Sequence, residues 1–527
     1  MSYKNIISKD MNLAILTLPL VCLGIYLSYF YFGWASFFYF KYDLVNILTS
    51  SLNLSILIGL LNLICIFIIQ KINYKLLYFY KGLLFSSIIH FIFHFIIRFS
   101  DLRYKTVIIN FFDSNNIFLQ ILFFSLPFFI GIFIYFFTKT NISKIYKFLL
   151  ILILILLSLS VIRFKNIYDL EQDNKINYLK NDYNNLKNIN EVKNHSNKKK
   201  VFFLLFDEFD NEYLQKNLDY LPTLKELISK SFIHHQFYTP AEYTLDSIPA
   251  ILMGSSTKNT KIKYGKLSIV NLENQEIKFN KKNSIFADLD KRNLKSSIFG
   301  VTVAAGGGLP YCRVFNIHTC YDKLNFKKET VGFFKSIEIF FHITYISRLY
   351  NLHARLSFEE DEIKYKEEYI KISKLMFENS SNFINTNTDF IYIHYLFPHS
   401  PGISEQFIDL TNFKAQLSDY EKNFFIVEKT ISKIITDLQK YQGSLLIVTS
   451  DHWYKARTMY EKTDIPFPAV FFAKIIGDDQ FLTSNKPNNA SGIKKLVIDF
   501  FDQKISKNID IKSYFDNLSN HKTLLKR

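Results

Sequence analysis

The fold is decided by two stretches, VFFLLFDE at residues 201–208 and LLIVTSDH at residues 445–452. Each is a short, continuous apolar run that ends in ionisable side chains, which is typical of strands buried on both faces of a parallel sheet. Between them, TLDSIPAILMG at residues 244–254 places a hydroxyl in front of an apolar, helix-compatible run. Acids and an imidazole at strand ends, together with a hydroxyl, indicate metal-assisted phosphoryl or sulfuryl transfer.

The polar half of the chain repeats this pattern, which predicts one α/β domain over residues 200–505. Apolar strands alternate there with amphipathic helices, so we expect a central, mostly parallel sheet covered by helices on both faces. Ligands bind such sheets at the carboxyl ends of the strands. Strands are predicted at residues 201–206, 296–301, 389–396, 444–450 and 468–474, and helices at residues 220–230, 361–378 and 421–441.

The first part of the chain, residues 1–165, is apolar and contains several runs of about 20 residues, the length that crosses a bilayer. It is therefore predicted to be a multi-span α-helical membrane domain. A buried helical core is the alternative, and five such runs in series argue against it. The expected spans are residues 12–33, 46–70, 76–97, 117–138 and 146–163.

Lysine and arginine in the short loops predict the orientation of these spans. With a cytoplasmic N-terminus, seven basic residues lie in inside segments and four in outside loops. An odd number of spans then places everything after residue 165 outside the cytoplasm. We expect a multi-pass protein of the inner (cytoplasmic) membrane with an extracytoplasmic, periplasmic catalytic domain.

Cysteine placement gives a second indication of the compartment. Cys312 and Cys320 lie eight residues apart, beside a GGGLP turn at residues 306–310. A local disulfide between them fits an oxidising compartment, and a pair of free thiols in a cytoplasmic loop is the alternative.

Two polar segments flank the predicted α/β domain. Residues 166–199, rich in asparagine and lysine, are expected to be a linker, and residues 506–527 a basic tail. The formal charge of +16 comes from 63 basic and 47 acidic residues. No basic stripe interleaved with aromatic residues occurs, so nucleic acid is not expected as a partner. A basic surface beside a membrane would attract anionic head groups, although biased composition explains the lysines equally well.

The strand-end acids predict a metal site. Asp207 and Glu208 follow six apolar residues, and adjacent carboxylates at the end of a buried strand are costly unless a positive charge lies between them. Two acids on a solvated turn or a helix cap are the alternative. Asp451 and His452 repeat the pattern and supply ligands suited to zinc or manganese.

Thr244 is the candidate nucleophile, because a bound metal would lower the pKa of its hydroxyl. Taken alone, Thr244 is better explained as a helix N-cap, the usual role of threonine before an apolar run. Thr239 is a weaker alternative nucleophile that lacks the downstream Ser-x-Pro spacing. His234 and His235 are interpreted as structural.

The order of the motifs, strand with Asp-Glu, then Thr-x-x-Ser-x-Pro, then Ser-Asp-His, resembles the sulfatase and alkaline phosphatase superfamily. Sulfatases carry Cys/Ser-x-Pro-Ser-Arg with a glycine ten residues after the nucleophile, which is also the separation of Thr244 and Gly254. Ser247 falls on the serine of that motif. Against sulfate-ester hydrolysis, there is no cysteine at the nucleophile position, Asp246 replaces the first proline and Ile248 replaces the arginine.

A closer resemblance is to the membrane-anchored branch of that superfamily, the phosphoethanolamine transferases acting on lipid A and the phosphoglycerol transferases acting on lipoteichoic acid or periplasmic glucans. It implies transfer of phosphoethanolamine or phosphoglycerol from a phospholipid donor to an envelope glycan or lipid acceptor. The alternatives are a sulfatase-like hydrolase and a non-catalytic membrane protein with this fold.

The same resemblance assigns roles to individual residues. Thr244 would carry the transferred group, and His394 and His399 would contact the phosphate, protonate a leaving group or bind a second metal. Ser247 would contact the substrate. The implied zinc or manganese ligands are Asp207 and/or Glu208, Thr244, Asp451 and His452.

Overall fold

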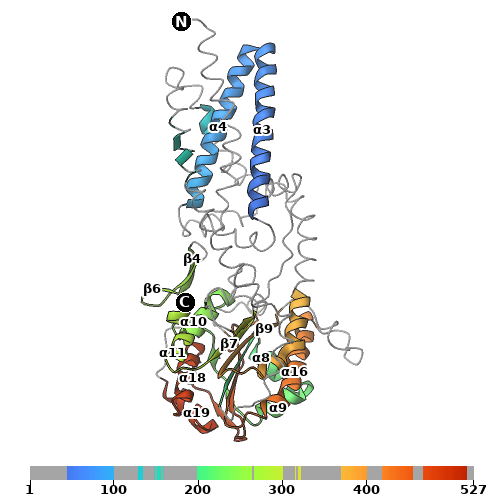
Figure 1. Cartoon of the computed structure of the whole chain (residues 1–527), viewed down its shortest axis with the longest axis vertical. Coiled ribbons are helices and arrows are strands. Elements are labelled where there is room, and N and C mark those ends of the chain that lie inside the picture. Colours follow the sequence, from blue (N-terminus) through green and yellow to red (C-terminus); the bar gives the residue numbers. More distant parts are fainter. Residues whose placement is uncertain are drawn as a thin grey trace. The chain divides into compact units, whose positions relative to one another are not determined.

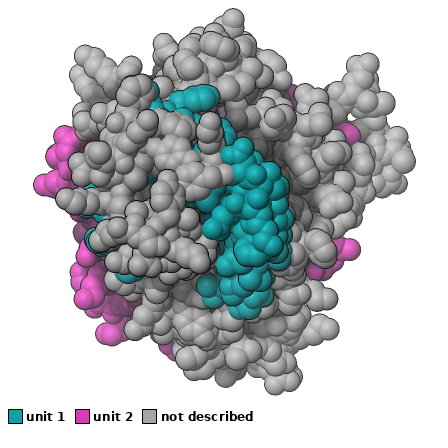
Figure 2. All heavy atoms as spheres, turned by 90° about the horizontal axis from the view of Figure 1, so that it is seen from above, with its two compact units in different colours: residues 1–173, 325–361 teal, residues 174–324, 362–527 magenta. Residues whose placement is uncertain are grey.

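The chain divides into two compact units, which Figure 2 colours separately. The first comprises residues 1–173 and 325–361, and the second comprises residues 174–324 and 362–527. The computed structural model describes residues 44–99, 129–133, 148, 151–152, 154–155, 158, 199–263, 266–300, 315, 319–321, 369–399, 418–454 and 467–518.

In the first unit, two helices follow one another with a single residue between them, α3 (Leu44–Ile72) and α4 (Tyr74–Phe99). They lie side by side (Figure 1), and the hydroxyl of Tyr80 on α4 donates a hydrogen bond to Asn62 Oδ1 on α3 over 2.7 Å. These helices contain the predicted spans 46–70 and 76–97. Among the described residues, one stretch, Leu52–Ile72, is long and apolar enough to cross a membrane.

The other expected spans, residues 12–33, 117–138 and 146–163, lie wholly or largely outside the described residues. So does the expected linker, except for Lys199. The five-span domain and its orientation therefore stay predictions.

The second unit is built on an eight-stranded sheet. All five predicted strands belong to it, and the three others that the structure describes in it are only three residues long. Runs that short carry no readable periodicity, which is why the sequence did not reveal them. In spatial order the strands are β12 (Leu482–Ser484), β2 (Phe232–His234), β11 (Phe471–Ile475), β10 (Leu445–Ser450), β1 (Val201–Asp207), β9 (Phe390–Pro398), β7 (Ser296–Phe299) and β8 (Thr319–Tyr321).

The sheet is mixed, with one strand reversed. β11 runs antiparallel to both of its neighbours, β10 and β2. The remaining described pairs, from β10 through β1, β9 and β7 to β8 and from β2 to β12, are parallel. The predicted mostly parallel sheet is therefore present, and its parallel centre brings the carboxyl ends of β10, β1 and β9 together.

Both faces of the sheet are buried, as the apolar strands predict. Phe202, Leu204 and Phe206 of β1 belong to one hydrophobic core, while the alternate residues Phe203 and Leu205 belong to the other. Burying a side chain of this size contributes roughly 1.5–3 kcal/mol. Figure 1 shows the covering helices on the two sides. One side has α8 (Asn211–Asn217), α9 (Pro222–Ile228), residues 369–384 and α16 (Asp419–Leu438); the other has α10 (Thr244–Met253), α11 (Ile285–Asp290), α18 (Ile493–Phe501) and α19 (Asn508–Asn517).

Helix α19 lies in the segment that we expected to be a basic tail. Its Ile511 and Phe515 are fully buried in the same core as α10 and α18. The folded unit therefore continues past residue 505. Smaller elements complete it: the sheet β4 (Asn259–Lys263), β5 (Lys266–Val270) and β6 (Glu276–Lys278), the pair β3 (Phe237–Tyr238) and β13 (Asn488–Asn489), and the 3-10 turns Leu218–Tyr220, Lys281–Asn283 and Ala490–Gly492.

Candidate metal centre and nucleophile

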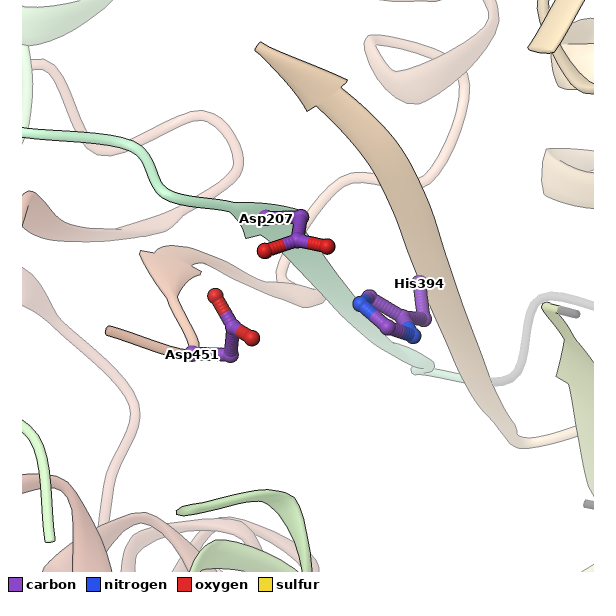
Figure 3. A group of neighbouring side chains, drawn as sticks. All are labelled: Asp207, His394 and Asp451. Atoms are coloured by element: carbon purple, nitrogen blue, oxygen red, sulfur yellow. The ribbon is translucent and has the colours of Figure 1, made fainter. Parts of the chain in front are cut away.

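The carboxyl ends of the central strands bring three predicted site residues together. Asp207 is the last residue of β1, Asp451 directly follows β10, and His394 lies in β9 opposite Leu205. Figure 3 shows the three side chains directed toward a common space. One ligand atom from each lies within 4.8 Å of the others, and all three side chains are buried.

His452 lies beside this group. Its Nδ1 is 2.9 Å from the main-chain oxygen of Trp453. Because that oxygen only accepts, Nδ1 carries the proton, and the Nε2 of the neutral ring has a lone pair to offer. Nε2 lies 3.4 Å from Asp207 Oδ1 and 3.4 Å from Asp451 Oδ2. This is the tautomer that binds a metal through Nε2.

The Asp451 carboxylate is oriented by main-chain donors. Its Oδ1 accepts hydrogen bonds from the N–H groups of Glu208 (3.1 Å) and His452 (2.8 Å). Its Oδ2 receives no hydrogen bond from the described residues. Burial raises the pKa of this carboxyl, but the positive charge of the His452 and His394 rings, when these are protonated, outweighs that effect and leaves the pKa below its usual value. Asp451 is therefore an anion with one oxygen directed into the cluster.

These residues fit a divalent metal. Two buried carboxylates this close together repel each other and need a positive charge between them. Carboxylate oxygens and imidazole nitrogens together suit zinc or manganese. Asp207, Asp451, His394 and His452 can therefore hold such an ion, and the buried surroundings strengthen its interactions.

Thr244 is the first residue of α10 and does not cap it. The N-cap is Tyr243, whose side chain makes no capping hydrogen bond. The Thr244 hydroxyl instead lies 3.1 Å from His452 Nε2. One turn later, the fully buried Ser247 donates a hydrogen bond to the main-chain oxygen of Asp451. Ser247 thus links α10 to the end of β10, and its predicted contact with the substrate stays a prediction.

Glu208 is not grouped with this cluster. Its backbone has φ of 63°, in the left-handed region, and its Oε1 lies 3.7 Å from His399 Nε2. Of the two adjacent acids that the sequence left open, Asp207 is the one grouped with His394 and Asp451. The His399 side chain is 25% exposed, against 4% for that of Glu208.

Two further observations concern residues away from the metal cluster. Cys312 lies outside the described residues while Cys320 is in β8, so their disulfide stays a prediction.

Tyr420, which the sequence did not single out, donates a hydrogen bond to the main-chain oxygen of Glu208 over 2.5 Å. A tyrosine near the start of an amphipathic helix reads as an ordinary core residue, so no sequence signal marked it.

Solved structures similar to this chain include several enzymes. Lipoteichoic acid synthase LtaP from Listeria monocytogenes is 15% identical, with 62% of this chain and 79% of that chain covered and a TM-score of 0.34. The zinc complex of the C-terminal periplasmic domain of EptC from Escherichia coli is 11% identical, with 58% and 83% covered and a TM-score of 0.36. The phosphonate monoester hydrolase SpPMH from Silicibacter pomeroyi is 13% identical, with 58% and 73% covered and a TM-score of 0.34.

These similarities are too low to indicate a substrate, and a comparison with curated proteins found no match. The family model described as Sulfatase, in contrast, matches residues 199–469, just over half of the chain. The matched range begins before β1 and contains both acids, both imidazoles and the hydroxyl of the cluster. The chain therefore belongs to the sulfatase family, within the alkaline phosphatase superfamily, and is an enzyme.

Proposed function

We propose that this enzyme transfers phosphoethanolamine or phosphoglycerol from a membrane phospholipid to an envelope glycan or lipid, through a covalent intermediate on Thr244. The observation that carries the proposal is the position of the Thr244 hydroxyl, 3.1 Å from His452 Nε2 at the edge of the acidic cluster. A plain hydroxyl at this position favours phosphoryl over sulfuryl transfer, because the sulfatase motif relies on a modified cysteine or serine there.

Transfer proceeds in two displacements. In the first, Thr244 Oγ1 attacks the phosphorus, the bond from phosphorus to the diacylglycerol oxygen breaks, and the hydroxyl proton ends on that oxygen. In the second, an acceptor hydroxyl attacks the phosphorus, the Oγ1–P bond breaks, and the acceptor proton returns to Thr244. Covalent catalysis of this kind divides one difficult displacement into two easier ones.

The surrounding residues would position the Thr244 hydroxyl and the phosphate and stabilise the negative charge that develops on them. Asp207, Asp451, His394 and His452 would hold a zinc or manganese ion, which supplies positive charge that lowers the pKa of the hydroxyl and stabilises the transferred phosphate. The first turn of α10 favours negative charge at Thr244. His399, partly exposed beside Glu208, would give a proton to the leaving oxygen.

A membrane location completes the proposal. The apolar helix segment Leu52–Ile72 supports an anchor, and an anchored enzyme meets its lipid donor in two dimensions. We infer a multi-pass protein of the inner membrane whose catalytic unit is extracytoplasmic, with the phospholipid donor, the glycan or lipid acceptor and the membrane as its partners.

Hydrolysis is the second candidate, because the matched family is that of the sulfatases. In that reaction water replaces the acceptor hydroxyl in the second displacement. The same residues would serve a phosphodiesterase or a sulfuric ester hydrolase, so only the fate of the transferred group separates the two candidates.

The test is to incubate the detergent-solubilised full-length protein with short-chain phosphatidylethanolamine or phosphatidylglycerol, without acceptor, and to measure its intact mass. We expect a stable gain of one phospho-substituent, mapped by peptide sequencing to Thr244 and missing in Thr244→Ala. The matched control is Thr239→Ala, which removes the other candidate hydroxyl and should still form the adduct. An adduct on Thr239 contradicts the nucleophile, and continuous donor cleavage without acceptor supports the hydrolase.

A further inference from the structure

The two peptide groups that flank Glu208 are held by side chains from different segments. On one side, the Glu208 N–H donates to Asp451 Oδ1 over 3.1 Å. On the other, the Glu208 carbonyl accepts a hydrogen bond from Tyr420 Oη over 2.5 Å, and the Asp210 N–H donates to the same Oη over 3.3 Å. Together these bonds hold Glu208 at a φ of 63°, a backbone conformation that is unfavourable for most residues other than glycine.

Tyr420 is itself rigidly placed. It is the second residue of α16, whose start is fixed by a reciprocal capping box between Ser418 and Glu421. Its buried ring stacks on Tyr454, with centroids 3.7 Å apart and planes at 9°, and meets Tyr213 edge-on at 5.1 Å. Burial, followed by the charges of Asp210 and Glu208, raises the pKa of its hydroxyl well above the ordinary value, so Tyr420 stays a protonated donor.

We propose that Tyr420 is a positioning residue for the metal centre, which holds Glu208 in the left-handed conformation and so determines where the two adjacent acids point. With the peptide groups on both sides fixed, Asp207 lies in the cluster and the Glu208 carboxylate lies beside His399. Without the Tyr420 hydroxyl, the peptide group after Glu208 keeps only the hydrogen bond from the Phe209 N–H to Ser450 Oγ, 2.7 Å long. The turn after β1 is then held less firmly, and so is the orientation of Asp207. The inference rests on the metal centre of the proposed function and not on which group is transferred.

The test uses Tyr420→Phe in the full-length protein, which keeps the stacked ring and removes only the hydroxyl. Isothermal titration of the EDTA-stripped protein with zinc should give a dissociation constant about 10-fold or more above that of wild type, the size typical of lost support behind a metal ligand. Activity should recover substantially at high zinc concentration, because the reacting groups are unchanged.

The matched control is Tyr441→Phe. Its hydroxyl donates to Asn385 Oδ1 over 3.1 Å, and its ring packs on Phe202, near the start of β1 and away from the cluster. We expect a similar small change in Tm for both variants, with zinc affinity altered only in Tyr420→Phe. Equal zinc affinity in wild type and Tyr420→Phe overturns the inference, and a wild type that binds no zinc overturns the metal centre itself.

A double-mutant cycle tests the route by which Tyr420 acts. Glycine adopts a positive φ without strain, so in a Glu208→Gly background the hydroxyl has little left to hold. There, Tyr420→Phe should change the zinc dissociation constant by less than about 3-fold, since the two positions are coupled. An undiminished effect would contradict the role of the Glu208 backbone.

Discussion

The catalytic unit buries histidines in two opposite kinds of environment. His394 and His452 lie among carboxylates at the ends of the central strands. His234, in β2, is just as buried, but its ring is surrounded by Phe232, Phe237, Phe471 and Phe515. Burial alone therefore does not mark a functional histidine in this protein.

The hydrogen bonds explain what separates the two environments. His234 Nε2 lies 2.9 Å from Asn488 Nδ2, which also faces the main-chain oxygens of Phe515 and Lys486. The amide therefore donates to the ring, and Nε2 is already used. In His452 the hydrogen bond is on Nδ1 and Nε2 faces acids and the Thr244 hydroxyl. The hydrogen-bond partner of His234 Nε2 is thus a neutral amide, whereas His452 Nε2 faces two carboxylates, an arrangement suited to a metal ligand.

The largest effect is expected from Asp451→Asn, which replaces a charged neighbour of His394 and His452 with a neutral amide. Removing one charge from a buried group of charges costs about 2–5 kcal/mol, so zinc affinity should fall by roughly 30-fold to several thousand-fold, and turnover with it. Zinc content after dialysis, measured by mass spectrometry, checks this. The control is Asp499→Asn. Asp499 lies on α18 and pairs with Lys495 and Lys504, away from the cluster, so this variant should keep its zinc.

The sequence predicted the catalytic strands because their signal is local. VFFLLFDE and LLIVTSDH each carry the apolar run, the strand end and the acid within eight residues, and parallel pairing then brings the ends together. The interpretation of His234 as structural agrees with its position in the aromatic core.

Other parts depended on contacts between distant residues. The choice between Asp207 and Glu208 follows from a left-handed backbone held by Tyr420, which lies 212 residues further along the chain. Whether Thr244 caps its helix was decided by where α10 begins. The antiparallel placement of β11 and the burial of α19 likewise follow from tertiary packing, which no local pattern encodes.

The buried His234 should also make the stability of the protein depend on pH. Burial lowers the pKa of His234 to about 4, against an ordinary value of 6.5. The unfolded chain therefore binds a proton between these values that the folded chain does not, so the free energy of unfolding falls as the pH drops from about 6.5 to about 4. The loss attributable to this group is up to about 3 kcal/mol.

Replacement of His234 with glutamine separates this contribution from the titration of carboxylates. His234→Gln keeps an acceptor for Asn488 and does not titrate. We expect the decline in Tm between pH 6.5 and pH 4 to be shallower in this variant than in wild type, while zinc affinity at pH 7.5 stays the same. Parallel Tm curves would show that His234 is not the acid-sensitive group.

The smallest expected effects come from two buried serines, one in each region. Ser247 donates to the main-chain oxygen of Asp451, and Ser231, just before β2, donates to that of Leu227 over 2.6 Å. Ser247→Ala and Ser231→Ala should each cost about 1 kcal/mol of stability, the net contribution of one hydrogen bond. The two variants should therefore show similar losses of Tm. Turnover should fall severalfold only in Ser247→Ala, because the Ser247 hydrogen bond holds α10 and Thr244 against the end of β10. Equal turnover in the two variants would mean that Thr244 is positioned by the rest of α10, and the region around Asp451 would then tolerate a lost hydrogen bond as readily as the aromatic core does.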